Sequence, residues 1–211
     1  MNGVVRRGAL IVLEGCDRCG KSTQARKLVD TLVAGGTPAE LWRFPERSSS
    51  IGQLIGSYLE KKSEVEDHAI HLLFSANRWE SVPRMRKLLQ DGTTVVVDRY
   101  AYSGVAFTAA KEGFDIEWCK QPDRGLPEPD LVLYLTIGAE DAAKRADFGG
   151  ERYEQTDFQK RVADMYGLLR EDRWETLDAS QSIKDLHDQI AKLTRDIITR
   201  VENKPINKLW M

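Results

Sequence analysis

The chain has 211 residues, of which 41% are hydrophobic and 30% are charged, a composition typical of a folded domain with a sizeable core. Its 31 Lys and Arg residues nearly balance 33 Asp and Glu residues, which argues against a surface that coats nucleic acid or binds membranes. The apolar run at 9–13 is too short for a signal-peptide core or a spanning helix, and three cysteines fit reduced thiols. We therefore expect a protein of the cytoplasm or nucleus.

Short apolar runs alternate with longer amphipathic segments, a pattern that predicts βαβ units on a parallel sheet. The predicted strands are residues 8–14, 39–43, 93–98, 130–136 and 174–178. The predicted helices are residues 21–34, 50–60, 66–90 with a break at Pro83, 101–111, 115–121, 139–146, 156–172 and 181–202. We expect a single α/β domain over 1–211 with three layers, in which a central five-stranded parallel sheet is flanked by helices.

A phosphate-binding motif follows the first predicted strand. Residues 15–22 match G-x-x-x-x-G-K-[ST] and lead directly into a predicted helix, which is the context that this motif requires. Its glycines let backbone N–H groups converge on phosphate, Lys21 reaches the β- and γ-phosphates, and the Ser22 hydroxyl can bind Mg²⁺. A chance match in a glycine-containing turn is the alternative. The segment predicts an ATP site that contains Gly15, Cys16, Arg18, Cys19, Gly20, Lys21, Ser22 and Thr23.

Charged residues follow two other predicted strands. The second strand runs into the segment 43–47, and the third ends at Asp98 and Arg99. Ligands of parallel sheets collect at these strand ends, so Asp98 is a candidate to hold the water shell of Mg²⁺ near Ser22. Asp98 could instead cap the next helix, and the segment 43–47 could be a solvated turn. Arg47, in the segment after the second strand, and Arg99, after the third strand, form an anion site. This site indicates a second, phosphorylated substrate.

The predicted helix at 66–90 carries Phe74 and Arg78 on one face, because they are four residues apart. A ring and a guanidinium in this arrangement can stack on a nucleobase and hydrogen-bond to it. The alternative is that Phe74 joins the core while Arg78 is solvated. His68 and His71 lack a metal-ligand pattern, so we interpret both as ordinary helix residues.

The segment 144–154 contains a Lys-Arg pair and then Gly149 and Gly150 before Tyr153. A flexible lid is one interpretation of this glycine-hinged, charged segment, and a plain surface loop is the other.

Cys16 and Cys19 have the C-x-x-C spacing that elsewhere indicates redox or zinc chemistry. No second cysteine pair or histidine pair completes a zinc site. We favour the interpretation that Cys16 and Cys19 are small residues tolerated at variable positions of the loop.

Taken together, these segments resemble the thymidylate kinase family, the nucleoside monophosphate kinases that make dTDP, and in particular its eukaryotic and poxvirus-type members. The resemblance rests on residues 7–15, 17–23, 43–47, 72–79, 97–101, 103–107, 126–131 and 209–210, which occur in the order of the family. Each stretch is short, but their joint occurrence is specific.

The resemblance implies a role for many residues. Arg47 and Arg99 would clamp the phosphate of dTMP, Phe74 would stack on thymine, and Arg78 would hydrogen-bond the edge of the base. Tyr153 would press on the deoxyribose, and Asp17 would meet the 3′-hydroxyl with an arginine nearby. The implied dTMP site comprises Asp17, Phe44, Arg47, Phe74, Arg78, Arg99, Ser103, Gly104, Phe107 and Tyr153.

The family also implies the donor site and the assembly. Arg145 and the loop of Asp178, Ala179 and Ser180 would cover the adenine of ATP, and the chain would form a homodimer. Asp17, Arg18 and Lys21 would take part in catalysis, with Lys21, Arg18 and Mg²⁺ stabilising the transferring group.

Three alternatives remain open at the level of sequence. A deoxynucleoside kinase would share the phosphate loop, but its acceptor has no phosphate and does not require both Arg47 and Arg99. A GTP-hydrolysing switch should carry Asn-Lys-x-Asp after a strand, and the Asn-Lys pairs here lie at 203–204 and 207–208 without that aspartate. A redox-sensing binding protein would depend on Cys16 and Cys19 alone.

Overall fold

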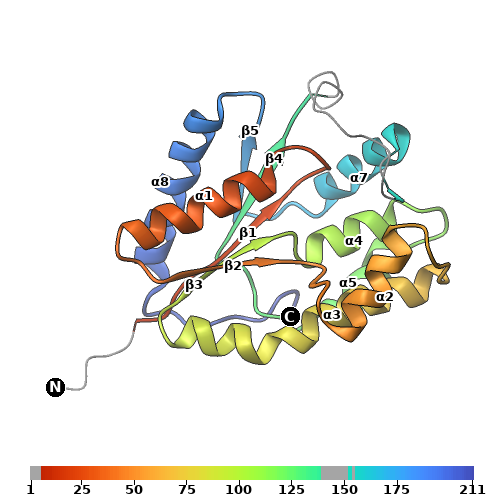
Figure 1. Cartoon of the computed structure of the whole chain (residues 1–211), viewed down its shortest axis with the longest axis horizontal. Helices are drawn as coiled ribbons and strands as arrows, with labels where there is room; N and C mark the ends of the chain where they lie inside the picture. The colour runs from red at the N-terminus through yellow and green to blue at the C-terminus, as the bar shows by residue number, and fades with distance from the viewer. Residues whose placement is uncertain (1–5, 139–151, 154) are drawn as a thin grey trace.

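A parallel β-sheet forms the centre of the molecule (Figure 1). The computed structural model describes residues 6–138, 152–153 and 155–211. The strands β1 (Leu10–Glu14), β2 (Ala39–Arg43), β3 (Thr94–Asp98), β4 (Leu131–Thr136) and β5 (Trp174–Asp178) are ordered β2-β3-β1-β4-β5. All four neighbouring pairs are parallel. The predicted five-stranded parallel sheet is therefore confirmed.

Helices cover both faces of this sheet. α1 (Lys21–Ala34) and α8 (Ile183–Val201) pack against each other on one face, whereas the other face carries α3 (Asp67–Gln90), α4 (Ala101–Ala109) and α7 (Thr156–Leu168) (Figure 1). Beyond α3 lie α2 (Ser50–Leu59), α5 (Ile116–Lys120) and the short 3₁₀ turn η1 (Gln121–Asp123). None of the helices in the described ranges has the length and apolar character to cross a lipid bilayer.

The central strand β1 is buried along its whole length. Ile11 and Leu13 belong to the core shared with α1 and α8, while Leu10 and Val12 belong to the core on the α3 and α4 side. A strand with apolar residues on both faces is typical of a sheet covered by helices on both sides. This packing fixes the carboxyl end of β1, where the phosphate loop begins.

The predicted break at Pro83 is wrong, because α3 runs without interruption from Asp67 to Gln90. Proline removes one hydrogen bond and crowds the preceding turn. Val82, Met85 and Leu89 bury that part of the helix in the core, and this packing keeps the helix continuous. The predicted helix at 139–146 lies outside the described residues.

The C-terminal segment is tied to the proline-rich connection that precedes β4. Leu126 and Leu209 pair through their backbones, with Leu209 N donating to Leu126 O at 2.8 Å and Gly125 N donating to Leu209 O at 3.0 Å. Arg7 holds Asp130 with bonds of 2.8 and 2.7 Å from its two terminal nitrogens. These contacts hold in place the segment that connects η1 with β4. η1 carries Asp123, which belongs to the site described below.

Candidate active site

The phosphate loop leaves β1 in a conformation that only a glycine adopts readily. Gly15 has φ +138°, and a Cβ there would lie 2.3 Å from the carbonyl oxygen of Leu135. The Lys21 ammonium lies over the loop, 2.7 Å from Cys16 O and 3.4 Å from Cys19 Sγ. No side chain among the described residues caps the first turn of α1. The loop therefore presents a lysine and the positive end of a helix together.

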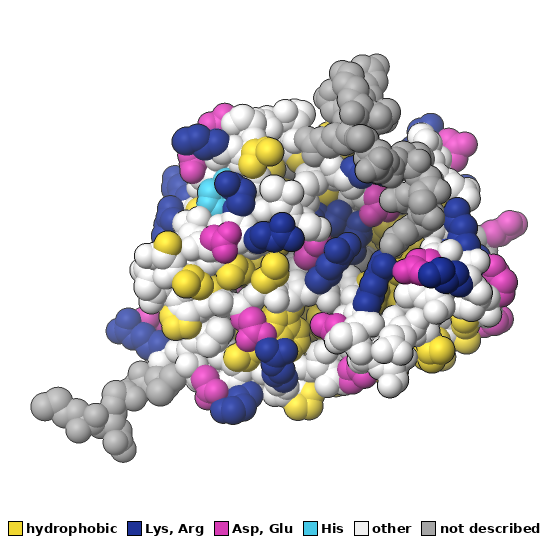
Figure 2. Space-filling view, viewed as in Figure 1, with side chains coloured by type: hydrophobic (Ala, Val, Ile, Leu, Met, Phe, Trp, Pro, Cys, Tyr) yellow, Lys and Arg dark blue, Asp and Glu magenta, His cyan; other side chains and the backbone are white. Residues whose placement is uncertain are grey.

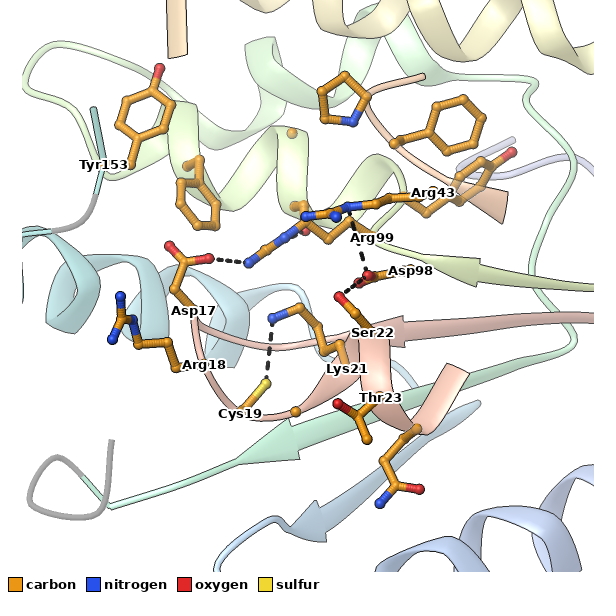
Figure 3. Close-up of a pocket in the computed structure, with 18 of the residues that line it drawn as sticks. Asp17, Arg18, Cys19, Lys21, Ser22, Thr23, Arg43, Asp98, Arg99 and Tyr153 are labelled. Carbon is orange, nitrogen blue, oxygen red and sulfur yellow. Dashed lines mark hydrogen bonds and ion pairs between the residues drawn. The ribbon is translucent and has the colours of Figure 1, made fainter. Parts of the chain in front are cut away.

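Ser22 and Asp98, the two predicted metal-site residues, are in direct contact. Ser22 Oγ donates a hydrogen bond to Asp98 Oδ2, and Arg43 Nε lies 3.8 Å from the same oxygen (Figure 3). The other oxygen, Asp98 Oδ1, is buried and has no hydrogen-bond partner within the described chain. The cap of α4 is Tyr100, so Asp98 is not that helix cap. A hydroxyl beside a carboxylate with a spare oxygen suits a divalent cation and its water shell.

Asp17 points toward Arg99, and the two side chains form an ion pair (Figure 3). Gln159 on α7 donates to Asp17 Oδ2 at 2.7 Å, and Asp17 N donates back to Gln159 Oε1 at 3.1 Å. Burial alone raises the pKa of Asp17, but the charges of Arg99 and Lys21 and the bond from Gln159 hold this pKa below its ordinary value. Asp17 is thus a carboxylate that connects the loop with β3 and α7.

Glu14 is a fully buried carboxylate behind the loop. Its Oε1 accepts from Tyr100 N at 2.8 Å and Ser103 N at 3.1 Å, at the start of α4. Its Oε2 accepts from Ser103 Oγ at 2.5 Å and Tyr166 OH at 2.9 Å. Arg99 in turn donates to Ser103 Oγ at 3.2 Å. Glu14 therefore fixes the start of α4 and, through Ser103, the arginine at the end of β3.

Phe74 and Arg78 face the cavity from α3, as their spacing predicts. Phe74 packs against the apolar cluster of α2 and α3. Arg78 is buried rather than solvated, and it forms a two-bond ion pair with Asp123 at 3.0 and 2.5 Å. The backbone of α4 approaches so closely that a Cβ at Gly104 would lie 2.7 Å from Arg78 Nη2. The guanidinium is thus enclosed between η1 and α4.

Tyr153 lines the cavity within a cluster of aromatic side chains. Its ring stacks on Phe158 with centroids 5.3 Å apart and meets the edge of Phe107 at 5.6 Å. Its hydroxyl donates to Tyr58 OH at 3.2 Å. The neighbouring Arg152 donates to Tyr58 O at 3.0 Å and to Glu64 at 2.7 Å, which fastens this point of the chain to the end of α2.

These elements enclose a cavity of about 590 Å³ at the carboxyl ends of β1, β2 and β3. Figure 2 shows Lys and Arg side chains gathered around the hollow in this face of the molecule. Most predicted site residues line this one cavity, namely Asp17, Arg18, Cys19, Gly20, Lys21, Ser22, Thr23, Phe44, Arg47, Phe74, Arg78, Asp98, Arg99, Ser103, Gly104, Phe107, Tyr153 and Ala179.

Some predicted site residues lie beside the cavity instead of on its wall. Gly15 and Cys16 form the back of the loop, with Gly15 O accepting from Arg99 at 3.3 Å. Asp178 and Ser180 bond to each other, since Ser180 N and Oγ both lie 2.8 Å from the Asp178 carboxylate. The predicted residue Arg145, with the glycines at 149–150, lies outside the described residues.

Sequence reasoning missed several residues of the site. Glu14 and Asp123 support arginines, Gln159 supports Asp17, and Gln24 and Gln181 line the cavity near Ala179. An acid that ends a strand of apolar residues was a usable signal for Glu14. Asp123 and Gln159 act on partners far away in the chain, and spacing does not reveal such pairs.

The three cysteines are free thiols. Burial and the nearby Cys19 raise the pKa of Cys16 to about 11, and burial raises that of Cys119 to about 12. The described residues contain no cluster of three or more His, Cys, Asp or Glu side chains that could hold a metal ion. Within the described part of the chain, the loop cysteines therefore form no disulfide and belong to no group of three ligands that could hold zinc.

The fold and the loop define the class of this protein, an α/β protein of the P-loop NTPase type. Residues 13–190 match the family model described as thymidylate kinase. The chain belongs to the thymidylate kinase family.

Similar proteins from two vertebrates and a fungus support this assignment. The chain is 59% identical to the thymidylate kinase of Homo sapiens over 97% of its length and 98% of that relative. It is 53% identical to the thymidylate kinase of Danio rerio, with the same coverage of 97% and 98%. A solved structure of thymidylate kinase from Candida albicans superimposes with a TM-score of 0.87 at 37% identity and covers 96% of this chain and 98% of that one. The deoxynucleoside kinase alternative is not favoured by these likenesses.

Proposed function

We propose that this chain is a phosphotransferase that moves the γ-phosphoryl group of ATP to dTMP, which yields ADP and dTDP, a step in dTTP synthesis. The observation that carries the proposal is a single cavity with two unlike ends. One end is the phosphate loop around Lys21, and the other combines Phe74 and Arg78 with Arg99. A donor and an acceptor nucleotide bound in one cavity bring their phosphates together.

The donor end suits ATP. The phosphates belong on the backbone of the loop and on Lys21, and the adenine belongs near Ala179, which lines the cavity beside Gln181 and Ile183. Arg145, Asp178 and Ser180 remain proposed partners of the adenine.

The acceptor end suits a pyrimidine deoxynucleotide with a phosphate. Phe74 offers a stacking surface, and the buried Arg78 offers N–H donors to the base. Arg47 and Arg99 supply positive charge for the phosphate, and Tyr153 with Phe107 forms an aromatic wall for the sugar. Phe44, Ser103 and Gly104 complete the lining.

The mechanism needs no catalytic base. The second pKa of a phosphate monoester is about 6, so the attacking oxygen is mostly ionised at neutral pH. Catalysis then consists of alignment and charge neutralisation, which Lys21 and Arg18 supply from the loop. Thymidylate kinases are ATP-dependent kinases that generally use a divalent metal, and we propose Mg²⁺ here, held by Ser22 and Asp98. When bound, this ion neutralises charge on the phosphates of ATP.

The wider organisation of the protein follows as part of the same proposal. We propose a single domain over 1–211 with a lid near 144–154, in a cytoplasmic or nuclear compartment.

We also propose a homodimer. Leu54 on α2 is 57% exposed, and Leu72 and Trp79 on α3 are 49% and 38% exposed, so these two contacting helices offer apolar surface to a second copy. Light scattering at two concentrations tests the assembly.

Product identification tests the proposed reaction. Purified protein with ATP and magnesium is supplied with dTMP or with thymidine at equal concentration, and the nucleotides are separated by chromatography. We expect dTDP from dTMP and no dTMP from thymidine. Formation of dTMP from thymidine would instead establish a deoxynucleoside kinase.

A further inference from the structure

The ion pair of Arg78 with Asp123 is buried between α3, η1 and α4, at the wall of the cavity. The Arg78 side chain is 2% exposed and the Asp123 side chain is fully buried. Arg78 Nε donates to Asp123 Oδ1 at 3.0 Å, and Nη2 donates to Oδ2 at 2.5 Å. Ser75 Oγ, one turn earlier on α3, adds a bond to Oδ1 at 2.7 Å. Both oxygens of Asp123 are therefore engaged on the α3 side.

Two neighbours hold the pair in this one arrangement. η1, which carries Asp123, is fastened to α3 because Trp79 Nε1 donates to Pro122 O at 2.7 Å. On the other side, a Cβ at Gly104 would lie 2.7 Å from Arg78 Nη2 and 3.0 Å from Nη1. The two bonds to Asp123 and the close backbone of α4 thus hold the plane of the guanidinium in place. Because the guanidinium is planar, its third nitrogen, Nη1, is fixed as well.

Nη1 is the nitrogen that the protein leaves available to a ligand. Among the described residues, none accepts a hydrogen bond from it, while Arg78 lines the cavity together with Phe74. A guanidinium has donors and no acceptor, and it stays protonated in proteins. It can therefore satisfy a carbonyl oxygen on a base, but an amino group at the same place leaves buried donors unpaired.

We propose that Asp123 is a positioning residue for base selection. It holds Arg78 so that Nη1 meets a ring carbonyl of the acceptor pyrimidine and rejects a base that carries an amino group there. The inference rests on the proposed function, since it concerns the acceptor end of the same cavity. It adds to that function a residue, Asp123, that touches no substrate and acts through Arg78.

The test compares dUMP with dCMP, because these acceptors differ only at ring positions 3 and 4. The readout is the ratio of their kcat/KM values for the wild type and for Asp123→Asn. The carboxamide turns an N–H₂ group toward the guanidinium, so we expect the ratio to fall by about 10-fold or more, with the KM for ATP unchanged. An unchanged ratio would overturn the inference.

A matched control separates positioning from general stability. Asp130→Asn breaks another two-bond pair with an arginine, Arg7, at 2.7 and 2.8 Å, away from the cavity lining. We expect this variant to lose thermal stability while the dUMP to dCMP ratio stays at the wild-type value. A similar loss of selectivity in both variants would show a merely structural role.

The double variant tests whether Asp123 acts through its arginine. On an Arg78→Met background, we expect Asp123→Asn to cause no further change in the ratio, whereas additive losses would contradict the proposal. If Asp123→Asn does not fold, Ser75→Ala is the second variant, since it removes one bond to Asp123 and leaves the charges in place. It should lower the ratio by about threefold, and an unchanged ratio would again overturn the inference.

The wild-type measurements distinguish this inference from the proposed function. A protein that phosphorylates dTMP but uses dUMP and dCMP equally well refutes the role of Asp123 and leaves the function standing. A protein that does not phosphorylate dTMP refutes both.

Discussion

The carboxylate of Asp17, in the phosphate loop, is ion-paired with Arg99 at the end of β3. Asp17 stands in the phosphate loop, and the family resemblance assigns its carboxylate to the 3′-hydroxyl of dTMP, while Arg99 belongs to the pair of arginines that we assign to the phosphate of dTMP. A change at either residue therefore removes the charged partner of the other.

The Asp17–Arg99 pair should make stability depend on pH only in acid. Burial opposes ionisation, but Arg99 and Gln159 hold the pKa of Asp17 below its ordinary value of 3.8. A lowered pKa in the folded state means that the pair contributes fully above about pH 4 and is lost as the pH falls further. Urea unfolding should show Asp17→Asn to be less stable by about 1–3 kcal/mol between about pH 5 and 8. A difference that grows as the pH falls below 4 would contradict this sign.

Arg18 should matter in the transition state more than in binding. Its φ is +67°, a region that glycine adopts without strain, so Arg18→Gly removes the charge and leaves the loop conformation accessible. Steady-state kinetics should show kcat lowered by about 100-fold with the KM for dTMP little changed. Arg26→Ala, an exposed change on α1, serves as the control. An unchanged kcat for Arg18→Gly would assign the catalytic charge to residues of the proposed lid.

Tyr153 should exclude the 2′-hydroxyl by the shape of its ring. The ring is held by Phe107 and Phe158, and its hydroxyl bonds to Tyr58. Tyr153→Ala should raise the kcat/KM for UMP relative to dUMP by about 10-fold or more, while Tyr153→Phe, which keeps the ring, should leave this ratio near the wild-type value. Equal ratios in the wild type and the alanine variant would move the sugar gate to Phe107 or to Asp17.

The cysteines should react slowly at neutral pH. The pKa of Cys16 is raised to about 11, so only about one thiol in a thousand is ionised at pH 8. Alkylation by iodoacetamide, followed by mass spectrometry, should accelerate as the pH approaches 11, and ATP should slow it at Cys16 and Cys19. Cys119 lies away from the loop and is the internal control, because ATP should leave its rate unchanged. Rapid labelling of Cys16 at pH 7.5 would indicate a redox role.

Local patterns predicted the parts of the fold that local physics determines. The strand, loop and helix around Lys21 and the spacing of Phe74 and Arg78 were readable, because period and motif encode them directly. Pro83 was misread, since the loss of one hydrogen bond was weighed without the burial of Met85 and Leu89. The partners Asp123 and Gln159 were not predicted, because each meets its partner only after distant segments pack together. The same limit explains why the burial of Arg78 could not be inferred.

The selectivity for the acceptor nucleotide is the most direct measure of the proposed reaction. ADP release is coupled to an optical signal and measured with ATP, magnesium and each of dTMP, AMP, GMP and CMP at equal concentration. Because we assign Phe74 and Arg78 to the base of the acceptor, we expect dTMP to be phosphorylated far faster than the other three. Rates with AMP or CMP equal to the rate with dTMP would contradict it.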